Sequence, residues 1–222
     1  MMDWRQVFGA DAIYMIYGPA MVGKTTLAVN IADADLKAGR HVTYIATEFN
    51  LKPILDKIKP HVSELHEYYD PMGLLNWLNG FSIKTPATLI IDSLGGVRMN
   101  YMADYSRTTG GLPDTFRVNM LIQIIVHRII EAWTMGGLKV ILINHESPEI
   151  KREFYSEDTY PTSARKALHD SMIVVRLFTR EVTEGNVVKI ARVGKVILDR
   201  YGILAKDAPN NPIYFSLPEP LF

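Results

Sequence analysis

The sequence predicts an α/β protein with a mostly parallel central sheet flanked by helices and with antiparallel strands near its C-terminal end. Apolar runs of strand length alternate with segments of helical periodicity, and such runs without polar alternation are typical of strands buried on both faces. The first run, residues 12–17, leads directly into the glycine-containing segment GPAMVGKT. Several strand-like segments follow one another between residues 171 and 216, which favours an antiparallel tail.

The first half of the chain supplies the alternating elements. A strand is expected at residues 12–17 and a helix at 25–37, where apolar positions share one face before the stop at Ala38-Gly39. A second strand at 41–46 ends at Thr47-Glu48. The remaining elements expected here are a short helix at 51–58, a short strand within 63–69, a helix at 71–78 and a buried strand at 87–91 that ends in Asp92.

The second half is expected to contain two long polar loops. Residues 95–114 are polar and glycine-rich, and residues 146–167 are polar with a short helix near 163–168; loops this long in a compact domain are usually functional. The longest helix is expected at 115–135, followed by a strand at 138–143 that ends at Asn144-His145. Further strands are expected at 171–178, at 187–193 and 194–199 paired as a hairpin, and at 213–216.

Size and composition indicate one domain across residues 1–222, because 222 residues with 48% hydrophobic and 22% charged content suit a single core. The 24 basic and 24 acidic residues balance, which argues against polyanion binding by bulk charge. The chain has no cysteine and hence no thiolate chemistry. No apolar run is long enough to cross a membrane and the first residues lack a signal pattern, so we expect a cytoplasmic protein without membrane partners.

The segment GPAMVGKT fits the pattern G-x-x-x-x-G-K-[ST] between a buried strand and a helix. Backbone N–H groups of such a loop surround a phosphate, and the helix N-terminus adds positive potential. Lys24 would supply a charge for the outer phosphates, and the Thr25 hydroxyl a ligand for Mg²⁺. The residues expected to bind nucleotide are Gly18, Pro19, Ala20, Met21, Val22, Gly23, Lys24, Thr25 and Thr26.

Polar residues at three strand ends are candidates for the remaining chemistry. Asp92 follows a buried strand and could hold Mg²⁺ through water, or it could simply cap the next element. Glu48 could polarise a water that attacks the γ-phosphate, or it could be a surface glutamate. His145 could sense the γ-phosphate, or it could be an ordinary loop histidine.

With the glycine loop (residues 18–25), Glu48, Asp92 and His145 in this order, the chain resembles the RecA/RadA superfamily of ATPases. The resemblance is to short RadA paralogs (RadB-like) and KaiC-like single-domain proteins in particular. Residues 18–26 look like the Walker A motif, and Leu89-Ile90-Ile91-Asp92-Ser93 is similar to Walker B. Glu48 stands where the family has its catalytic base, and His145 stands where it has an Asn-Gln pair or a histidine switch. The resemblance implies a RecA-like P-loop core that binds ATP and Mg²⁺, with Glu48, Lys24 and His145 as catalytic residues and Thr25 and Asp92 at the metal.

The resemblance also implies a role in recombination or repair, with single-stranded DNA contacting loops 95–114 and 146–167. Basic and aromatic residues on mobile loops suit phosphate contact and base stacking, although acidic neighbours largely cancel the charge. No F-x-x-A linker precedes the core, so filaments like those of RadA are not expected, while a recombinase partner or self-association stays open. The DNA-binding candidates are Arg98, Arg107, Lys151 and Arg152.

Two other readings stay open. A KaiC-like regulatory ATPase would need no DNA, and Arg192 and Lys195 could then act on a neighbouring subunit's nucleotide or simply face solvent. A small-molecule kinase or partitioning ATPase would share the phosphate loop, but the kinase would show an arginine-rich lid. The partitioning ATPase would carry an early lysine where this chain has Pro19, Ala20 and Met21.

Overall fold

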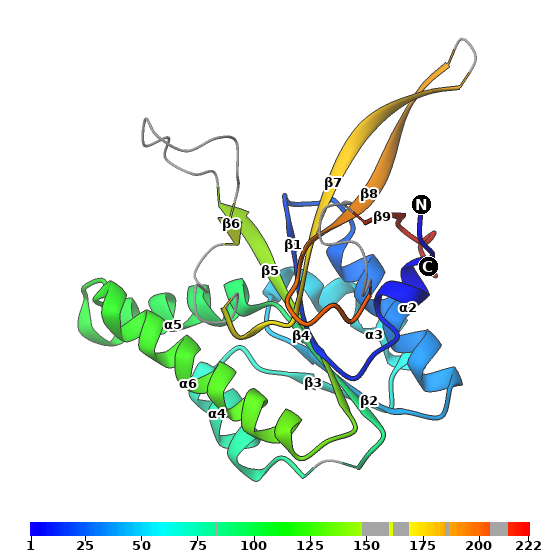
Figure 1. Cartoon of the computed structure of the whole chain (residues 1–222). Helices are drawn as coiled ribbons and strands as arrows, with labels where there is room; N and C mark the ends of the chain where they lie inside the picture. The colour runs from blue at the N-terminus through cyan, green and yellow to red at the C-terminus, as the bar shows by residue number, and fades with distance from the viewer. Residues whose placement is uncertain (83, 148–159, 162–168, 185–186, 205–212) are drawn as a thin grey trace.

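The computed structural model describes residues 1–82, 84–147, 160–161, 169–184, 187–204 and 213–222 (Figure 1). The helices are α1 (Trp4–Val7), α2 (Lys24–Lys37), η1 (Phe49–Ile54), α3 (Leu55–Ile58), η2 (Lys59–His61), α4 (Pro71–Gly80), α5 (Leu94–Thr109) and α6 (Thr115–Thr134). The strands are β1 (Ile13–Gly18), β2 (His41–Ala46), β3 (Glu64–Glu67), β4 (Ala87–Asp92), β5 (Leu138–Ser147), β6 (Tyr160–Pro161), β7 (Ile173–Glu184), β8 (Val187–Asp199) and β9 (Tyr214–Ser216).

The sheet is mostly parallel, as the sequence predicts. Its strand order is β3-β2-β4-β5-β1-β7-β8-β9, with the short β6 paired to β5. Along this order, every neighbouring pair from β3 to β7 is parallel, whereas β8 runs antiparallel to both β7 and β9. The expectation of an α/β fold with antiparallel C-terminal strands is therefore confirmed.

Two helical layers bury the sheet on both faces. Figure 1 shows α2 and α3 on one side of the sheet and α4, α5 and α6 on the other. Along β1, Tyr14 and Ile16 pack into the cluster formed with α2, whereas Ile13, Met15 and Tyr17 pack into the cluster formed with α4, α5 and α6. All six positions of β1 are buried, which explains its uninterrupted apolar run.

Residues 95–114 were expected to form a loop, and for most of this range the expectation is wrong. Helix α5 begins at Leu94, where the Ser93 Oγ accepts a hydrogen bond from the Gly96 backbone N–H, and it ends where Gly110 adopts a left-handed conformation. Glycines early in this segment suggested irregular backbone, but they serve close helix packing instead. Only residues 110–114 connect α5 to α6 without helical structure.

The C-terminal strands form a long hairpin. The expectation that residues 187–193 and 194–199 pair with each other as a hairpin is wrong. They form the single strand β8, and its hairpin partner is β7, with pairs from Ile173↔Asp199 to Glu184↔Val187. Only Ile173–Val175 and Arg176 of β7 also pair with β1, and β9 covers only Val193, Gly194 and Lys195 of β8. The far half of the hairpin therefore extends beyond the sheet, as Figure 1 shows.

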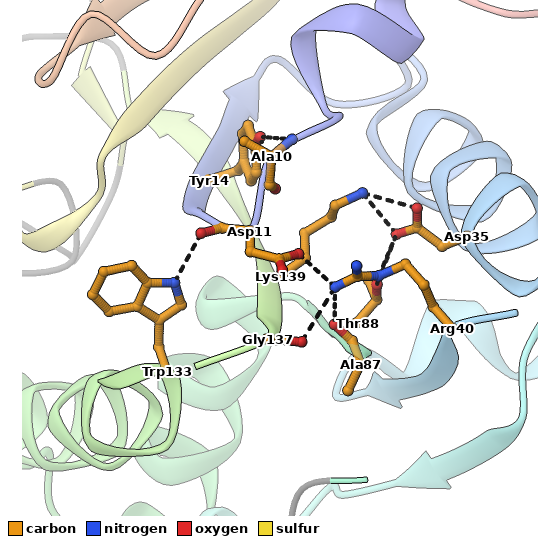
Figure 2. A network of polar contacts seen from close by, with 10 residues as sticks. All are labelled: Ala10, Asp11, Tyr14, Asp35, Arg40, Ala87, Thr88, Trp133, Gly137 and Lys139. Atoms are coloured by element: carbon orange, nitrogen blue, oxygen red, sulfur yellow. Dashed lines mark hydrogen bonds and ion pairs between the residues drawn. The ribbon is translucent and has the colours of Figure 1, made fainter. Parts of the chain in front are cut away.

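A polar network joins the elements at the amino ends of the parallel strands (Figure 2). Arg40, just before β2, donates to Asp11 Oδ1, to the carbonyl of Ala87 and to Thr88 Oγ1. The Thr88 hydroxyl donates to Asp35 Oδ2 over 2.7 Å. These contacts fasten β4 and the end of α2 to the segment before β1, at the opposite end of the strands from residues 18–25.

Among the residues that the structure describes, no helix is both long and apolar enough to cross a membrane. The short helix expected near 163–168 lies outside the described residues.

Candidate functional site

The polar strand ends predicted from the sequence meet at one edge of the sheet. Strands β1, β2, β4 and β5 are mutually parallel, so their carboxyl ends point the same way. The register places Gly18 opposite His145 and Ala46 opposite Asp92. Because β5 lies between β1 and β4, His145 is located between the glycine loop (residues 18–25) and Asp92.

The glycine loop has the backbone shape that its two glycines permit. Gly23 has a φ of 104°, in the left-handed region that favours glycine, and it precedes the first turn of α2. A Cβ on Gly18 would lie only 2.4 Å from the carbonyl oxygen of Leu177, so β7 can pass close to the loop only because a side chain is missing there. The side chain of Met21 at the loop tip is 94% exposed.

Lys24 is folded back onto its own loop. Its Nζ donates to the carbonyl oxygen of Gly18 over 2.9 Å and to that of Pro19 over 2.7 Å. Burial lowers the pKa of Lys24, and the negative charges of Asp92, Glu48 and Glu146 oppose that shift. The glycine loop, whose shape suits an anion, therefore holds a buried ammonium group.

Thr25 is hydrogen-bonded to the buried Asp92 at the edge of the sheet. Thr25 Oγ1 and the Tyr44 hydroxyl each donate to Asp92 Oδ2 over 2.7 Å. Burial raises the pKa of Asp92 to about 6, although these two hydrogen bonds act in the opposite direction. No ion pair to Asp92 is found among the described side chains, so this carboxylate lacks a cationic partner there.

Glu48 is held by His145 and Ser93. His145 Nε2 lies 2.8 Å from Glu48 Oε1, and the Ser93 hydroxyl donates to the same oxygen. Burial disfavours the charged carboxylate, but the hydrogen bonds from His145 and Ser93 prevail and lower the pKa of Glu48 to about 2. Since Glu48 is thus ionised at neutral pH, Nε2 of His145 must carry the proton that it donates.

Helix α5 forms a tight second layer behind these residues. A Cβ on Gly95 would lie 2.7 Å from the ring of His145, and one on Gly96 would lie 2.8 Å from Cγ of Glu48. The buried Asn100 donates through Nδ2 to the carbonyl oxygen of Thr47 over 2.7 Å. The position of Glu48 is therefore fixed by the packing of α5 as well as by its hydrogen bonds.

The side chains present could hold a divalent cation only together with oxygen atoms of a bound ligand. The described residues contain no group of three or more His, Cys, Asp or Glu side chains arranged to hold a metal ion. Asp92 and Thr25 supply one carboxylate and one hydroxyl, which suits Mg²⁺, an ion that proteins often bind with one or two carboxylates, waters and substrate phosphates. The raised pKa of Asp92 and the lack of an ion-pair partner for it within the described part of the chain fit the same assignment.

A cavity of about 500 Å³ opens beside this site, between η1, the start of α4 and α5. Phe49, the residue after Glu48, stacks on Tyr69 with ring centroids 4.3 Å apart, and the Lys52 ammonium lies 4.9 Å from the centroid of Tyr69. The remaining lining residues are Asp70, Asn100, Ala103, Asp104 and Arg107.

The residues expected to contact DNA do not form one loop surface in the described chain. Arg98 is half-buried on α5. Arg107, on the last turn of the same helix, is exposed and forms an ion pair of 2.6 Å with Asp104. Lys151 and Arg152 lie outside the described residues.

Three contributors to this site were not predicted from the sequence: Ser93, Tyr44 and Asn100. The signal for Ser93 was present, because it directly follows Asp92 and begins a helix. Tyr44 lies on the buried strand next to β4, where a buried hydroxyl usually needs a hydrogen-bond partner. Asn100 could not be found, because its segment was expected to be a loop.

The fold and the site together define an α/β protein with a glycine loop between β1 and α2 and a polar cluster at the carboxyl edge of its sheet. No family model and no curated protein sequence matches the chain.

Proposed function

We propose that the protein is a Mg²⁺-dependent ATPase with a RecA-like P-loop core. The observation that supports this most strongly is the meeting of Lys24, Thr25, Asp92, Glu48 and His145 around the glycine loop, from the ends of three strands and the start of one helix. Each residue type matches a different task in phosphoryl transfer to water.

In this proposal the loop N–H groups and the N-terminus of α2 bind the β- and γ-phosphates. The Lys24 ammonium exchanges the Gly18 and Pro19 carbonyl oxygens for phosphate oxygens, so its binding energy is the difference between the two sets of contacts. Thr25 and Asp92 hold Mg²⁺, which neutralises charge that develops on the phosphates.

Glu48 orients the attacking water. With a pKa of about 2 it accepts hydrogen bonds from water at any physiological pH, but it is a weak proton acceptor, so its main contribution is to position and polarise the nucleophile. His145 lies beside Gly18 in the sheet and contacts Glu48, and both positions support a response of His145 to the γ-phosphate.

The proposal extends to single-stranded DNA as an effector in recombination or repair, with a KaiC-like regulatory ATPase without a DNA role as the alternative. Arg107 supports the DNA proposal only in part, because its charge is already paired with Asp104. Titration of labelled single-stranded DNA at two salt concentrations, with MgATP present, separates the two readings, since phosphate contacts weaken steeply as salt rises.

The test of the ATPase proposal is equilibrium binding of MgATP and steady-state hydrolysis by the wild-type protein, Lys24→Ala and Lys37→Ala. Lys24→Ala should lose both activities. Lys37, at the other end of α2, has an exposed side chain whose ion pair among the described residues is with Asp33, so Lys37→Ala is the matched control and should behave as wild type. Undiminished hydrolysis by Lys24→Ala would refute the proposal.

A further inference from the structure

The base of the β7–β8 hairpin lies against the glycine loop. A Cβ placed on Gly23 would lie 3.7 Å from Cδ and 3.8 Å from Nη1 of Arg192, a residue of β8, and 3.1 Å from Cδ2 of Leu217. Gly23 is the residue from which α2 begins. The guanidinium group of Arg192 is therefore next to the loop of its own subunit.

The backbone of Arg192 is held from both sides. Thr179 of β7 is its register partner, and the Leu217 N–H donates to the carbonyl oxygen of Arg192 over 3.2 Å. Leu217 in turn directly follows β9, which pairs with β8 from Val193 onward. The position of this side chain thus depends on strand pairing on both sides, not on a free hairpin end.

The guanidinium group of Arg192 has no carboxylate partner among the residues that the structure describes. Its side chain is exposed and forms no ion pair within the described chain. Two other arginines near the sheet ends, by contrast, do form ion pairs: Arg176 lies 2.7 Å from Glu146, and Arg40 lies 2.6 Å from Asp11. A cation without a carboxylate, beside a loop suited to phosphate, has an anion as its natural partner.

The other basic residue of this strand is directed elsewhere. Lys195 is three positions from Arg192, and successive side chains of a strand alternate between the two faces. The Lys195 ammonium lies 5.9 Å from the ring centroid of Tyr214. Of the two basic residues singled out from the sequence, Arg192 faces the glycine loop and Lys195 does not.

We infer that Arg192 binds a phosphate of the nucleotide held by its own subunit, and so closes the glycine loop from the hairpin side. This inference rests on the proposed ATP binding. It differs from the alternative in which this arginine reaches the nucleotide of a neighbouring subunit, because the contact requires no second copy of the chain.

The first experiment measures MgATP affinity by titration calorimetry for the wild-type protein, Arg192→Ala, Arg192→Gln and Lys195→Ala. Loss of a charge-assisted hydrogen bond should weaken binding by about 10- to 100-fold in both Arg192 variants. Lys195→Ala should stay within about twofold of the wild type. Because the Arg192 side chain is exposed and forms no ion pair among the described residues, circular dichroism and the melting temperature should match those of the wild-type protein.

The second experiment distinguishes action within a subunit from action between subunits. Lys24→Ala, which keeps Arg192, is mixed with Arg192→Ala, which keeps the glycine loop, and ATP hydrolysis is measured. The inference predicts no recovery beyond the sum of the separate proteins. Recovery of activity in the mixture would overturn it, and so would wild-type affinity in Arg192→Ala. If the wild-type protein itself fails to bind MgATP, the proposed function fails instead.

Discussion

The ammonium group of Lys139 on β5 lies 2.8 Å from Oδ1 and 3.0 Å from Oδ2 of Asp35 on α2. Both side chains are nearly inaccessible to solvent, with 3% and 11% of their surface exposed. The pair fastens the last turns of the helix that follows the glycine loop to the strand that carries His145, at the amino end of the sheet (Figure 2).

Lys139→Met should destabilise the protein by up to about 3–5 kcal/mol, because it removes the nearer cation and leaves the charge of the buried Asp35 carboxylate largely uncompensated, with Arg40 Nε 4.0 Å from Oδ2. Chemical denaturation measures the change. The double variant Lys139→Met with Asp35→Asn should recover part of the loss, because the uncompensated charge is then gone as well. Lys37→Met is the control, since its exposed ion pair with Asp33 should contribute less than about 1 kcal/mol. Equal losses for Lys37→Met and Lys139→Met would contradict the role assigned to burial.

Glu48→Gln should keep MgATP binding but slow hydrolysis roughly 10²- to 10⁴-fold, because the amide cannot polarise water as the carboxylate does. Single-turnover hydrolysis and a binding titration separate the two effects. Turnover at the wild-type rate would exclude Glu48 as the residue that orients water.

Asp92→Asn should stabilise the nucleotide-free protein while it abolishes Mg²⁺-dependent hydrolysis. Burial raises the pKa of Asp92 from 3.8 to about 6, so the folded protein binds this proton more tightly than the unfolded chain does. Stability from this group is therefore fully present below pH 3.8, is lost as the pH rises to about 6, and stays lost above that.

The shift corresponds to a cost of up to ~3 kcal/mol at neutral pH. In buffer with a chelator, Asp92→Asn should therefore raise the free energy of unfolding at pH 7.5 but leave it nearly unchanged at pH 3.5. Glu48 should show the opposite sign, because its stabilisation is lost only as the pH falls from 4.5 to about 2. An Asp92→Asn protein that is less stable than wild type at pH 7.5 would show that its hydrogen bonds outweigh its desolvation.

Gly96→Ala should impair hydrolysis with little effect on ATP affinity. The new methyl group would lie 2.6 Å from Thr47 Oγ1 and 2.8 Å from Glu48 Cγ, so Glu48 would have to move. A displacement of about 1 Å at a reacting group can cost on the order of 10²-fold in rate. Gly80→Ala at the end of α4 is the control, because no atom lies within 4 Å of its Cβ position. Normal turnover in Gly96→Ala would mean that α5 does not position Glu48.

The sequence was sufficient for the elements that apolar runs define. Strands β1, β2, β4 and β5 were predicted because burial on both faces leaves no polar alternation, and their carboxyl ends already carried Glu48, Asp92 and His145. The glycine loop followed from its motif and from its place between strand and helix.

Strand register and close side-chain packing could not be predicted from the sequence. Nothing in residues 95 and 96 distinguishes glycines that loosen a loop from glycines that let a helix approach Glu48; only the neighbouring atoms decide it. Likewise, the position of Arg192 beside Gly23 depends on the register of β8 with β7 and β9, which local patterns do not encode.

Because Lys24 donates hydrogen bonds to the carbonyl oxygens of Gly18 and Pro19, the phosphate binding that we propose would exchange these contacts for contacts with phosphate oxygens. These two carbonyl oxygens can accept hydrogen bonds from the ammonium group in place of a phosphate. A diphosphate product should therefore leave the loop readily. This would favour a reaction cycle in which the loop must empty after each turnover.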